Sequence, residues 1–275
     1  MRNYCFILLF SVVMIIGCTN TQNFVATPPA TQATINEAEI GRQAFAQGDY
    51  AKAAEAYTQW LKKTPQDAEV LWERGRANFQ LKQYEAAGQD FEASVAANPK
   101  NLRALVSQAR LWIVLNQNEK AMNVLQMVKA NDSFAAMDAY NRFLAFYMEG
   151  QLHNTIGNYE KAAQSLEEAI KIYGLNPHTF EKEGMPYIHR FAVYQQAVAN
   201  YKRGNNRKAA QDMEEYIAIS QKAQAEVTSK DYKSVVLAYY LSENIQKCKA
   251  YLSYLSPEDK KDLHTQLGDN LFLQD

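Results

Sequence analysis

Apolar residues recur along this chain at intervals of three and four, which is the spacing of one helix face. In the clearest example, Ala53, Tyr57, Trp60 and Leu61 fall on one side of a predicted helix. A shorter run of the same kind precedes it and ends at Gly48, where a tight turn is expected. The pattern therefore predicts two short amphipathic helices joined by a turn, and it returns along most of the chain.

The pattern repeats with a period of 34 residues. Four positions keep their residue type from the first unit to the second: Gly41 and Gly75, Ala53 and Ala87, Tyr57 and Phe91, and Pro65 and Pro99. A small residue lets two helices approach closely, an aromatic ring fills the space beside it, and proline cannot continue the helix. These positions predict one supersecondary unit that is used several times.

This period and these positions resemble the tetratricopeptide repeat. The resemblance covers about residues 34–223 and implies an all-α fold, a right-handed α-solenoid of about five helix pairs. The predicted units are 34–67, 68–101, 102–135, 143–176 and 190–223. One pair cannot bury its apolar face alone, so the stacked units are expected to share one continuous core.

Two insertions interrupt the period. Residues 131–142 add about half a helix between the third and fourth units. Residues 177–189 contain Pro177, Gly184 and Pro186, which predict an ordered loop rather than a helix. Such a loop is either a simple insertion or a binding element.

The period fades after residue 223, and residues 224–275 are expected to form a helical cap over the end of the core. Residues 234–240 and 243–255 predict two tyrosine-rich helices. Ser256 followed by Pro257 predicts the start of a further helix that stops at Gly268. The apolar tail 271–273 is expected to dock on this cap or on a partner.

The amino terminus has the pattern of a secretion signal. Arg2 precedes an apolar run at 4–16, which is too short to span a bilayer comfortably, and Ile15-Ile16-Gly17-Cys18 follows. These four residues resemble a bacterial lipobox. The resemblance implies that 1–17 is a lipoprotein signal peptide and that Cys18 carries the lipid; the alternatives are an ordinary signal peptide or an uncleaved anchor.

The segment after Cys18 is expected to be a tether. Residues 18–33 have no charge and no apolar period, so we predict a flexible linker. Thr19, rather than aspartate, follows the cysteine, and by resemblance to lipoprotein sorting signals this favours the outer membrane. We therefore predict a cell-envelope protein, an outer-membrane lipoprotein that faces the periplasm.

Composition and motifs argue against catalysis. A formal net charge of −1 does not favour nucleic-acid binding. Nucleotide-binding, hydrolase and zinc-protease motifs are absent from the sequence, and the scattered histidines lack ligand spacing, although a metal site between His178 and His189 is conceivable. Cys248 is expected to be a small buried residue rather than a reactive thiol. We predict a binding protein that is not an enzyme and has no cofactor or metal.

The family resemblance also predicts where a partner binds, because in this family the first helix of each pair lines a groove. Carrying those positions over selects a ladder of three arginines, each one period after the last, with aromatic and apolar neighbours, and tyrosines further along. The predicted groove residues are Arg42, Phe45, Trp72, Arg76, Phe79, Arg110, Ile113, Tyr147, Tyr194 and Tyr201. Guanidinium groups beside aromatic rings suit carboxylates or a chain terminus.

Two interpretations of the ladder stay open. Glu39, Glu69 and Glu73 lie close in sequence and are able to pair with the arginines, which would leave only structural ion pairs. The lysine and asparagine residues of the chaperone-tail-binding members are absent, since Ala38 and Trp72 stand where lysine is required. Chaperone-tail binding is therefore not predicted.

Function follows from the anchor and the repeats together. We expect a membrane-anchored scaffold or adaptor for envelope proteins, resembling lipoproteins that dock peptidoglycan hydrolases or proteases, or pilotins that help assemble the secretin of type IV pili. The alternative is a surface lipoprotein that captures glycans or peptides on its tyrosine-rich second half.

Overall fold

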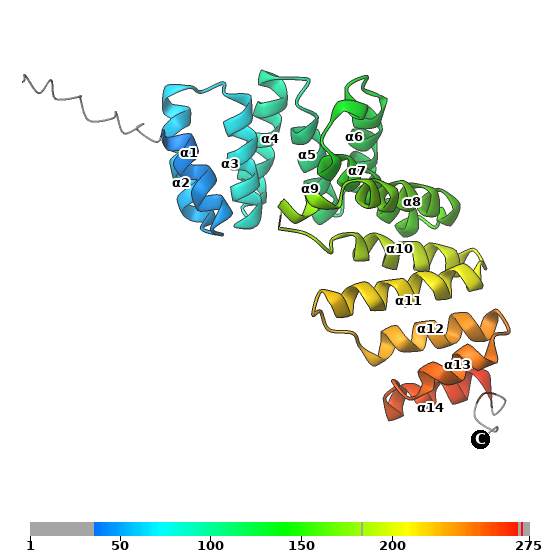
Figure 1. Ribbon diagram of the computed structural model, residues 1–275. Coiled ribbons are helices and arrows are strands. Elements are labelled where there is room, and N and C mark those ends of the chain that lie inside the picture. The colour runs from blue at the N-terminus through cyan, green and yellow to red at the C-terminus, as the bar shows by residue number, and fades with distance from the viewer. Residues whose placement is uncertain (1–35, 183, 269–270, 272–275) are drawn as a thin grey trace, which may run out of the picture. The chain divides into compact units, whose positions relative to one another are not determined.

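The helices of this protein come in antiparallel pairs that follow one another along the chain (Figure 1). The computed structural model describes residues 36–182, 184–268 and 271, and all regular elements in this part are helical. The predicted signal peptide (1–17) and tether (18–33), including Cys18, lie outside the described residues. The paired helices are α1 (Glu37–Ala46) and α2 (Tyr50–Lys63), α3 (Ala68–Gln80) and α4 (Tyr84–Ala97), α5 (Leu102–Val114) and α6 (Asn118–Ala130), α7 (Ala139–Thr155) and α8 (Tyr159–Leu175), and α10 (His189–Lys202) and α11 (Asn206–Lys222). The all-α solenoid of five repeated pairs is confirmed.

One type of turn joins the two helices of each pair. In the first turn Gly48 has a φ of 78°, and the N–H of Asp49 donates to the carbonyl of Ala44 at 2.9 Å. This left-handed residue followed by a bond to a carbonyl five residues back closes the end of a helix and satisfies its last carbonyls. The left-handed position recurs at Lys82, Asn116, Gly157, Gly204 and Glu243.

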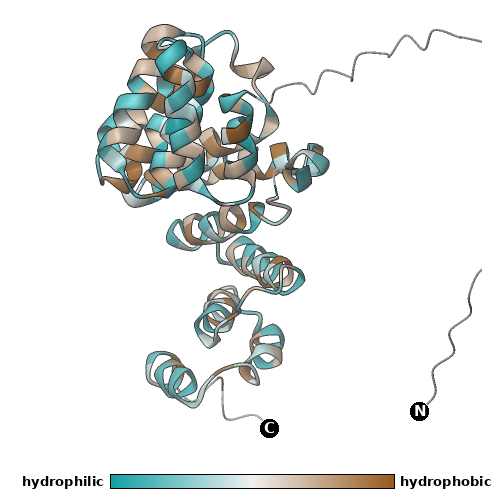
Figure 2. Ribbon diagram, turned by 90° about the vertical axis from the view of Figure 1, so that its left-hand side faces the viewer, coloured by the Kyte–Doolittle hydropathy of each residue, from teal (hydrophilic) through white to brown (hydrophobic). Residues whose placement is uncertain are grey.

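The predicted small and aromatic positions meet inside each pair. A Cβ added to Gly41 would lie 2.5 Å from Cε1 of Tyr57, and one on Gly75 would lie 2.6 Å from Cε1 of Phe91. Tyr57 and Phe91 are each 1 % exposed. Glycine is therefore required here by close packing of helix on helix. Hydrophobic and hydrophilic residues alternate along the helices (Figure 2).

The insertion before α10 corrects one prediction. Residues 177–189 were expected to form a loop, but Pro177–Lys182 is a short helix, α9. Proline suits the first helical position because no N–H is needed there. Phe180 is 0 % exposed, and its ring centroid lies 5.4 Å from that of Phe143 and 4.9 Å from that of Tyr173. Burial of this one aromatic ring stabilises α9, although the sequence of the insertion has no helical pattern of apolar residues.

The insertion between the third and fourth units holds only one helical turn. A 3-10 turn, η1, covers Phe134–Ala136, and α7 begins at Ala139, ahead of the predicted boundary at 143. Asp138 caps α7, because its side chain accepts the N–H of Asn141 at 2.9 Å. Residues 139–142 of the insertion therefore lengthen α7, and 131–138 connect it to α6.

Beyond α11 the pairing continues. Helices α12 (Ser229–Leu241) and α13 (Ile245–Leu252) are joined through Glu243, with the same left-handed turn as the earlier pairs. Helix α12 starts before the expected residue 234, since Thr228 and Asp231 form a capping box. The last helix, α14 (Pro257–Leu267), has Ser256 as its N-cap and ends at Gly268, as predicted.

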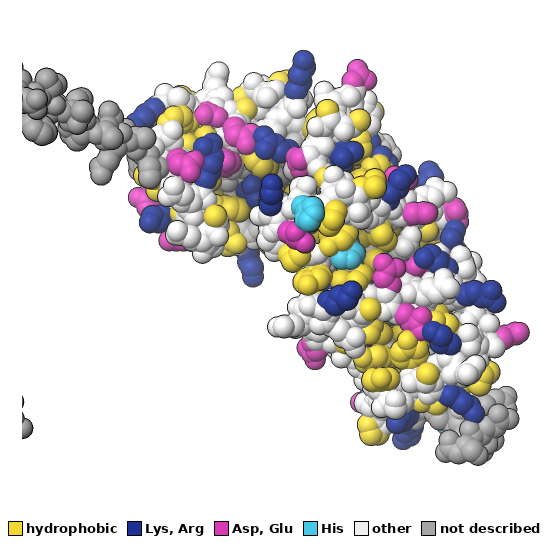
Figure 3. Space-filling model, in the orientation of Figure 1, with side chains coloured by type: hydrophobic (Ala, Val, Ile, Leu, Met, Phe, Trp, Pro, Cys, Tyr) yellow, Lys and Arg dark blue, Asp and Glu magenta, His cyan; other side chains and the backbone are white. Residues whose placement is uncertain are grey.

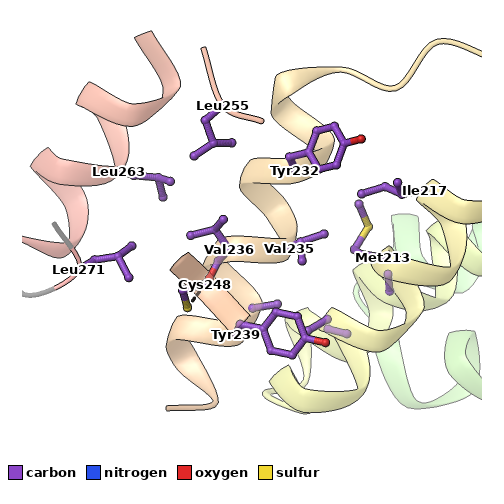
Figure 4. Packing of buried hydrophobic residues seen from close by; sticks show 14 residues of the cluster. Met213, Ile217, Tyr232, Val235, Val236, Tyr239, Cys248, Leu255, Leu263 and Leu271 are labelled. Carbon is purple, nitrogen blue, oxygen red and sulfur yellow. Dashed lines mark hydrogen bonds between the residues drawn. The ribbon is translucent and has the colours of Figure 1, made fainter. Parts of the chain in front are cut away.

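The last helices share a buried apolar cluster (Figure 4). Leu263 of α14 and Leu271 of the tail reach into it and are 0 % and 1 % exposed. Cys248 is 0 % exposed, and its thiol donates to the carbonyl of Val236 at 3.5 Å. Burial raises the pKa of this thiol to about 11, so it stays protonated and serves as the small buried residue that was predicted.

Candidate partner-binding groove

A cavity of about 670 Å³ runs along α1, α3 and α5. We call it the groove. All three arginines of the predicted ladder line it, together with three of their predicted aromatic neighbours: Arg42, Arg76 and Arg110, with Phe45, Trp72 and Phe79. On the face of the molecule drawn in Figure 3, basic and acidic side chains lie side by side over α1 and α3, and apolar side chains gather over α11 and α12.

The first arginine of the ladder is neutralised within the chain. Nε of Arg42 donates to Oε1 of Glu73 at 2.7 Å, and Nη1 reaches Oε2 of Glu39 at 3.5 Å. Glu73 is 9 % exposed, and burial raises the pKa of its carboxyl group although the bond from Arg42 opposes this. The same bond raises the pKa of Arg42. Arg42 is thus a structural partner of a buried acid.

The second and third arginines are held differently. The guanidinium carbon of Arg76 lies 4.6 Å from the ring centroid of Phe45 and 4.8 Å from that of Trp72. That of Arg110 lies 4.8 Å from the ring centroid of Phe79. Within 36–182 and 184–268 no carboxylate lies within ion-pair distance of either guanidinium, and no hydrogen-bond acceptor is within reach of their N–H groups.

A further arginine, which the sequence argument did not select, also lines the groove. Nη2 of Arg103 donates to Oε2 of Glu69 at 2.6 Å, and its guanidinium carbon lies 4.5 Å from the ring centroid of Trp72. Glu69 therefore neutralises Arg103 and not a ladder residue. The two residues stand one repeat period apart, so the period itself was a signal for this pair.

The other predicted groove residues lie outside this cavity. Ile113 packs against the core cluster of α5, α6 and α7. Tyr147 stacks on Phe143 with ring centroids 6.0 Å apart, and burial raises the pKa of its hydroxyl. Tyr194 and Tyr201 are 37 % and 39 % exposed on α10. The structure gathers six of the ten predicted residues in one cavity and leaves the other four outside it.

The far end of the groove is bounded by the insertion. Lys182, Gly184 and Met185 line the cavity together with Asp138 and Leu144 from the start of α7. Tyr173 donates its hydroxyl to the carbonyl of Pro186 and so fixes the segment after α9. The sequence argument could not find these residues, since an insertion has no counterpart in the repeat.

The described part of the chain contains neither a metal-binding cluster nor a membrane-spanning helix. Within it, no group of three His, Cys, Asp or Glu side chains is placed to hold a metal ion. None of its helices combines the length and the apolar character that crossing a membrane requires. The side chains that stand out are those of the groove, and their chemistry is hydrogen bonding, charge and aromatic stacking.

Comparison with known families identifies the repeats. Residues 39–101, 79–139 and 144–174 match models described as tetratricopeptide repeat. The chain therefore contains tetratricopeptide repeats over its first four helix pairs, and the structure adds further pairs of the same construction. Stacked helix pairs of this type form extended binding surfaces for other proteins.

Solved structures show the same fold at low identity. PilW, titled a widely conserved type IV pilus biogenesis factor, is 15 % identical, covers 82 % of this chain and 96 % of its own, and has a TM-score of 0.60. PilF of Pseudomonas aeruginosa is 12 % identical, covers 84 % and 96 %, and has a TM-score of 0.62. MamA of Desulfovibrio magneticus RS-1 is 18 % identical, covers 68 % and 94 %, and has a TM-score of 0.52. At these identities the similarity shows a shared fold and nothing further.

Proposed function

We propose that this protein is a lipid-anchored scaffold of the cell envelope that holds a segment of a partner protein in the groove of α1, α3 and α5. The observation that carries the proposal is the groove itself, about 670 Å³ in volume and lined by arginines and aromatic side chains from successive repeats. Arginine and aromatic residues dominate the binding energy of protein interfaces. The tetratricopeptide repeats support the same reading, and no step of it requires catalysis.

The anchor in this proposal is Cys18. Acyl chains on its thiol would hold the chain at a membrane, since each buried methylene contributes about 0.8 kcal/mol and several chains act together. The uncharged segment 18–33 would then let the repeats stand away from the lipid surface. We propose an outer-membrane location facing the periplasm on the basis of Thr19.

The partners that fit this proposal are envelope proteins: a peptidoglycan hydrolase, a protease or a secretin subunit. A pilotin role in secretin or type IV pilus assembly is favoured by the shared fold with PilW, which is named a type IV pilus biogenesis factor. A docking role for hydrolases or proteases remains the other form of the same proposal, and both use the groove.

One observation supports a second candidate, capture of glycans or peptides on α10. Phe191, Tyr194 and Tyr201 stand on this helix and are 47 %, 37 % and 39 % exposed. Exposed aromatic rings provide flat apolar surface with a polar edge at the tyrosine hydroxyl, and a sugar ring is able to stack on it. This surface is separate from the groove lining.

Site-specific photo-crosslinking in native envelopes tests the proposal. A benzophenone amino acid replaces one residue at a time: Gln80, which is exposed and lines the groove, Tyr201, which is exposed on α10, or Glu168, which is exposed on α8 and serves as the control. Crosslinks to a discrete envelope protein from position 80 and none from 168 are expected. Crosslinks only from position 201 on α10, or retained glycan without a protein, would replace the scaffold by the capture function.

The anchor is tested separately by Cys18→Ser. The substituted chain should leave the membrane fraction and lose labelled palmitate, because serine cannot replace the thiol that accepts the lipid. Absence of label from the unsubstituted chain would refute lipid anchoring and leave the groove proposal intact.

A further inference from the structure

Two of the groove arginines retain their full hydrogen-bonding capacity. Arg42 donates a hydrogen bond to the carboxylate of Glu73 at 2.7 Å, and Arg103 donates one to the carboxylate of Glu69 at 2.6 Å. Arg76 and Arg110 have neither a carboxylate nor another acceptor within the described part of the chain. The repeat places all of these residues in equivalent helices, yet only one pair of them is free to bind something else.

The charge of the lining agrees with this division. Among the described residues, the groove is lined by five cations and three acids, which leaves an excess of two positive charges. The acids are already used, because Glu69 and Glu73 pair with arginines and Asp138 caps α7. Among the described residues, the lining cations without a carboxylate partner are Arg76, Arg110 and Lys182, and an anionic occupant would complement their charge.

Aromatic contacts prepare Arg76 and Arg110 for directional bonding. The rings of Phe45 and Trp72 flank the guanidinium of Arg76 at 4.6 and 4.8 Å, and the ring of Phe79 lies 4.8 Å from that of Arg110. Stacking uses the flat face of a guanidinium and leaves its N–H edge for hydrogen bonds. That edge matches the two oxygens of a carboxylate, which it binds as a fork. Rings that restrict the guanidinium also reduce the entropy that binding would cost.

We infer that Arg76 and Arg110 receive two carboxylates from aspartate or glutamate side chains of one extended partner segment. This inference rests on the proposed function, since it names the chemistry of the segment that the groove holds. Two forks need two carboxylates, and one chain terminus supplies only one, so at least one acidic side chain is required, and an internal segment provides both from side chains. Packed helices lie about 8–10 Å apart and an extended chain advances about 3.3 Å per residue, which spaces the two acids about two to four residues apart.

A peptide selection tests the inference without knowledge of the natural partner. A random dodecapeptide library displayed on phage, with no free carboxyl terminus on the peptides, is selected on the full chain purified from its producing cells. Enrichment of Asp or Glu at two positions about two to four apart is expected. Selected peptides without acidic enrichment would overturn the inference while leaving a peptide-binding groove. A library from which nothing is enriched would overturn the proposed function and the inference with it.

Matched arginine variants assign the contact. The tightest selected peptide, made synthetically with an amidated terminus, is titrated by fluorescence anisotropy against wild type, Arg76→Gln, Arg110→Gln and the control Arg207→Gln, which lies on α11, is exposed and does not line the groove. Loss of either fork should weaken binding about 10- to 100-fold, the range of a charge-assisted hydrogen bond, while Arg207→Gln should change it less than about threefold. Equal losses in all three variants would overturn the assignment of the forks. A free-terminus version of the peptide should bind no more tightly, and a gain would point to a terminal carboxylate instead.

A substitution in the peptide provides a test that does not depend on how the arginine variants fold. Replacing one acid of the peptide by its amide should weaken binding to wild type, and should weaken binding to the matching arginine variant much less. Losses that simply add in this cycle would show that the acid and the arginine do not touch, and would overturn the inference. The wild-type affinity should also fall with rising salt, as expected for partly exposed charges.

Discussion

The contact between Gly75 and Phe91 offers a quantitative test of how a repeat is packed. In Gly75→Ala the new methyl group would lie 2.6 Å from Cε1 and 2.7 Å from Cδ1 of Phe91, and 3.1 Å from Cβ of Asp90. The ring has no free space to move into, because Phe91 is 1 % exposed. The core must therefore shift to admit one carbon atom.

Two opposing effects set the magnitude. Overpacking a core costs about 1–3 kcal/mol, and alanine in a helix interior recovers up to about 1 kcal/mol relative to glycine. A net loss of about 0–2 kcal/mol follows, which corresponds to a fall in Tm of up to about 8 °C for a chain of this size. Since solenoid stability is built from neighbouring repeats, the effect should be concentrated in α3 and α4.

Thermal unfolding followed by circular dichroism, with amide hydrogen exchange of α3 and α4, measures the effect. Gly174→Ala is the matched control, because Gly174 lies in α8 and a Cβ there meets nothing within 4 Å. It should leave Tm unchanged or raise it slightly. Equal Tm values for the two variants would refute the claim that close helix approach requires glycine at position 75.

The third unit supplies a compensating pair. Ala109 and Leu125 occupy the places of Gly75 and Phe91, and both are 0 % exposed. The double variant Gly75→Ala with Phe91→Leu should therefore be more stable than the sum of its single changes, with a coupling of about 0.5–3 kcal/mol. Strictly additive losses would mean that the two positions do not pack as one unit.

Two further predictions concern the insertion and its surroundings. Phe180→Ala should release α9 at a cost of about 3–5 kcal/mol to the local structure, seen as faster hydrogen exchange at residues 177–188, whereas Leu175→Ala, at a position 74 % exposed, should not. His189 is shielded from water and its ring stacks on Tyr173, and this burial lowers its pKa from 6.5 to about 4. Between these two pH values His189 is protonated in the unfolded chain and neutral in the folded chain. The free energy of unfolding should therefore decline as pH falls from about 6.5 to 4, by up to about 3 kcal/mol. His189→Gln should remove this slope in urea titrations at several pH values, while the exposed His178→Gln should keep it; an unchanged slope in His189→Gln would contradict the assignment.

The helix pairs could be predicted because the information for them is local. A period of 34 residues with small, aromatic and proline positions identifies where two helices meet and where they end. Ser256 and Gly268 set the ends of α14 through capping, which depends only on the nearest residues. The beginning of α12 was missed because its capping box lies in a stretch without apolar period.

Part of the groove was predictable for the same reason. Residues one period apart occupy equivalent places in successive helices, so Arg42, Arg76 and Arg110 were expected on one side of the repeats, and all three line the groove. The period could not say which arginine is neutralised. Glu39, Glu69 and Glu73 all lie near in sequence, and a bond of 2.7 Å to Arg42 exists only in one packing of α1 on α3.

The amino-acid sequence by itself determined the repeat, the helix pairs and the equivalence of the arginines. Helix periodicity and close helix packing both depend on the spacing of residues along the chain, which the sequence contains. Only the tertiary structure decided that α9 is helical, since its stability comes from burying Phe180 among rings of α7 and α8. Only the tertiary structure separated the paired Arg42 from Arg76 and Arg110, which have no ion-pair partner among the described residues, because a salt bridge depends on tenths of an ångström between helices. Spacing along the chain specifies which residues share a face, and packing specifies which of them remain free to bind.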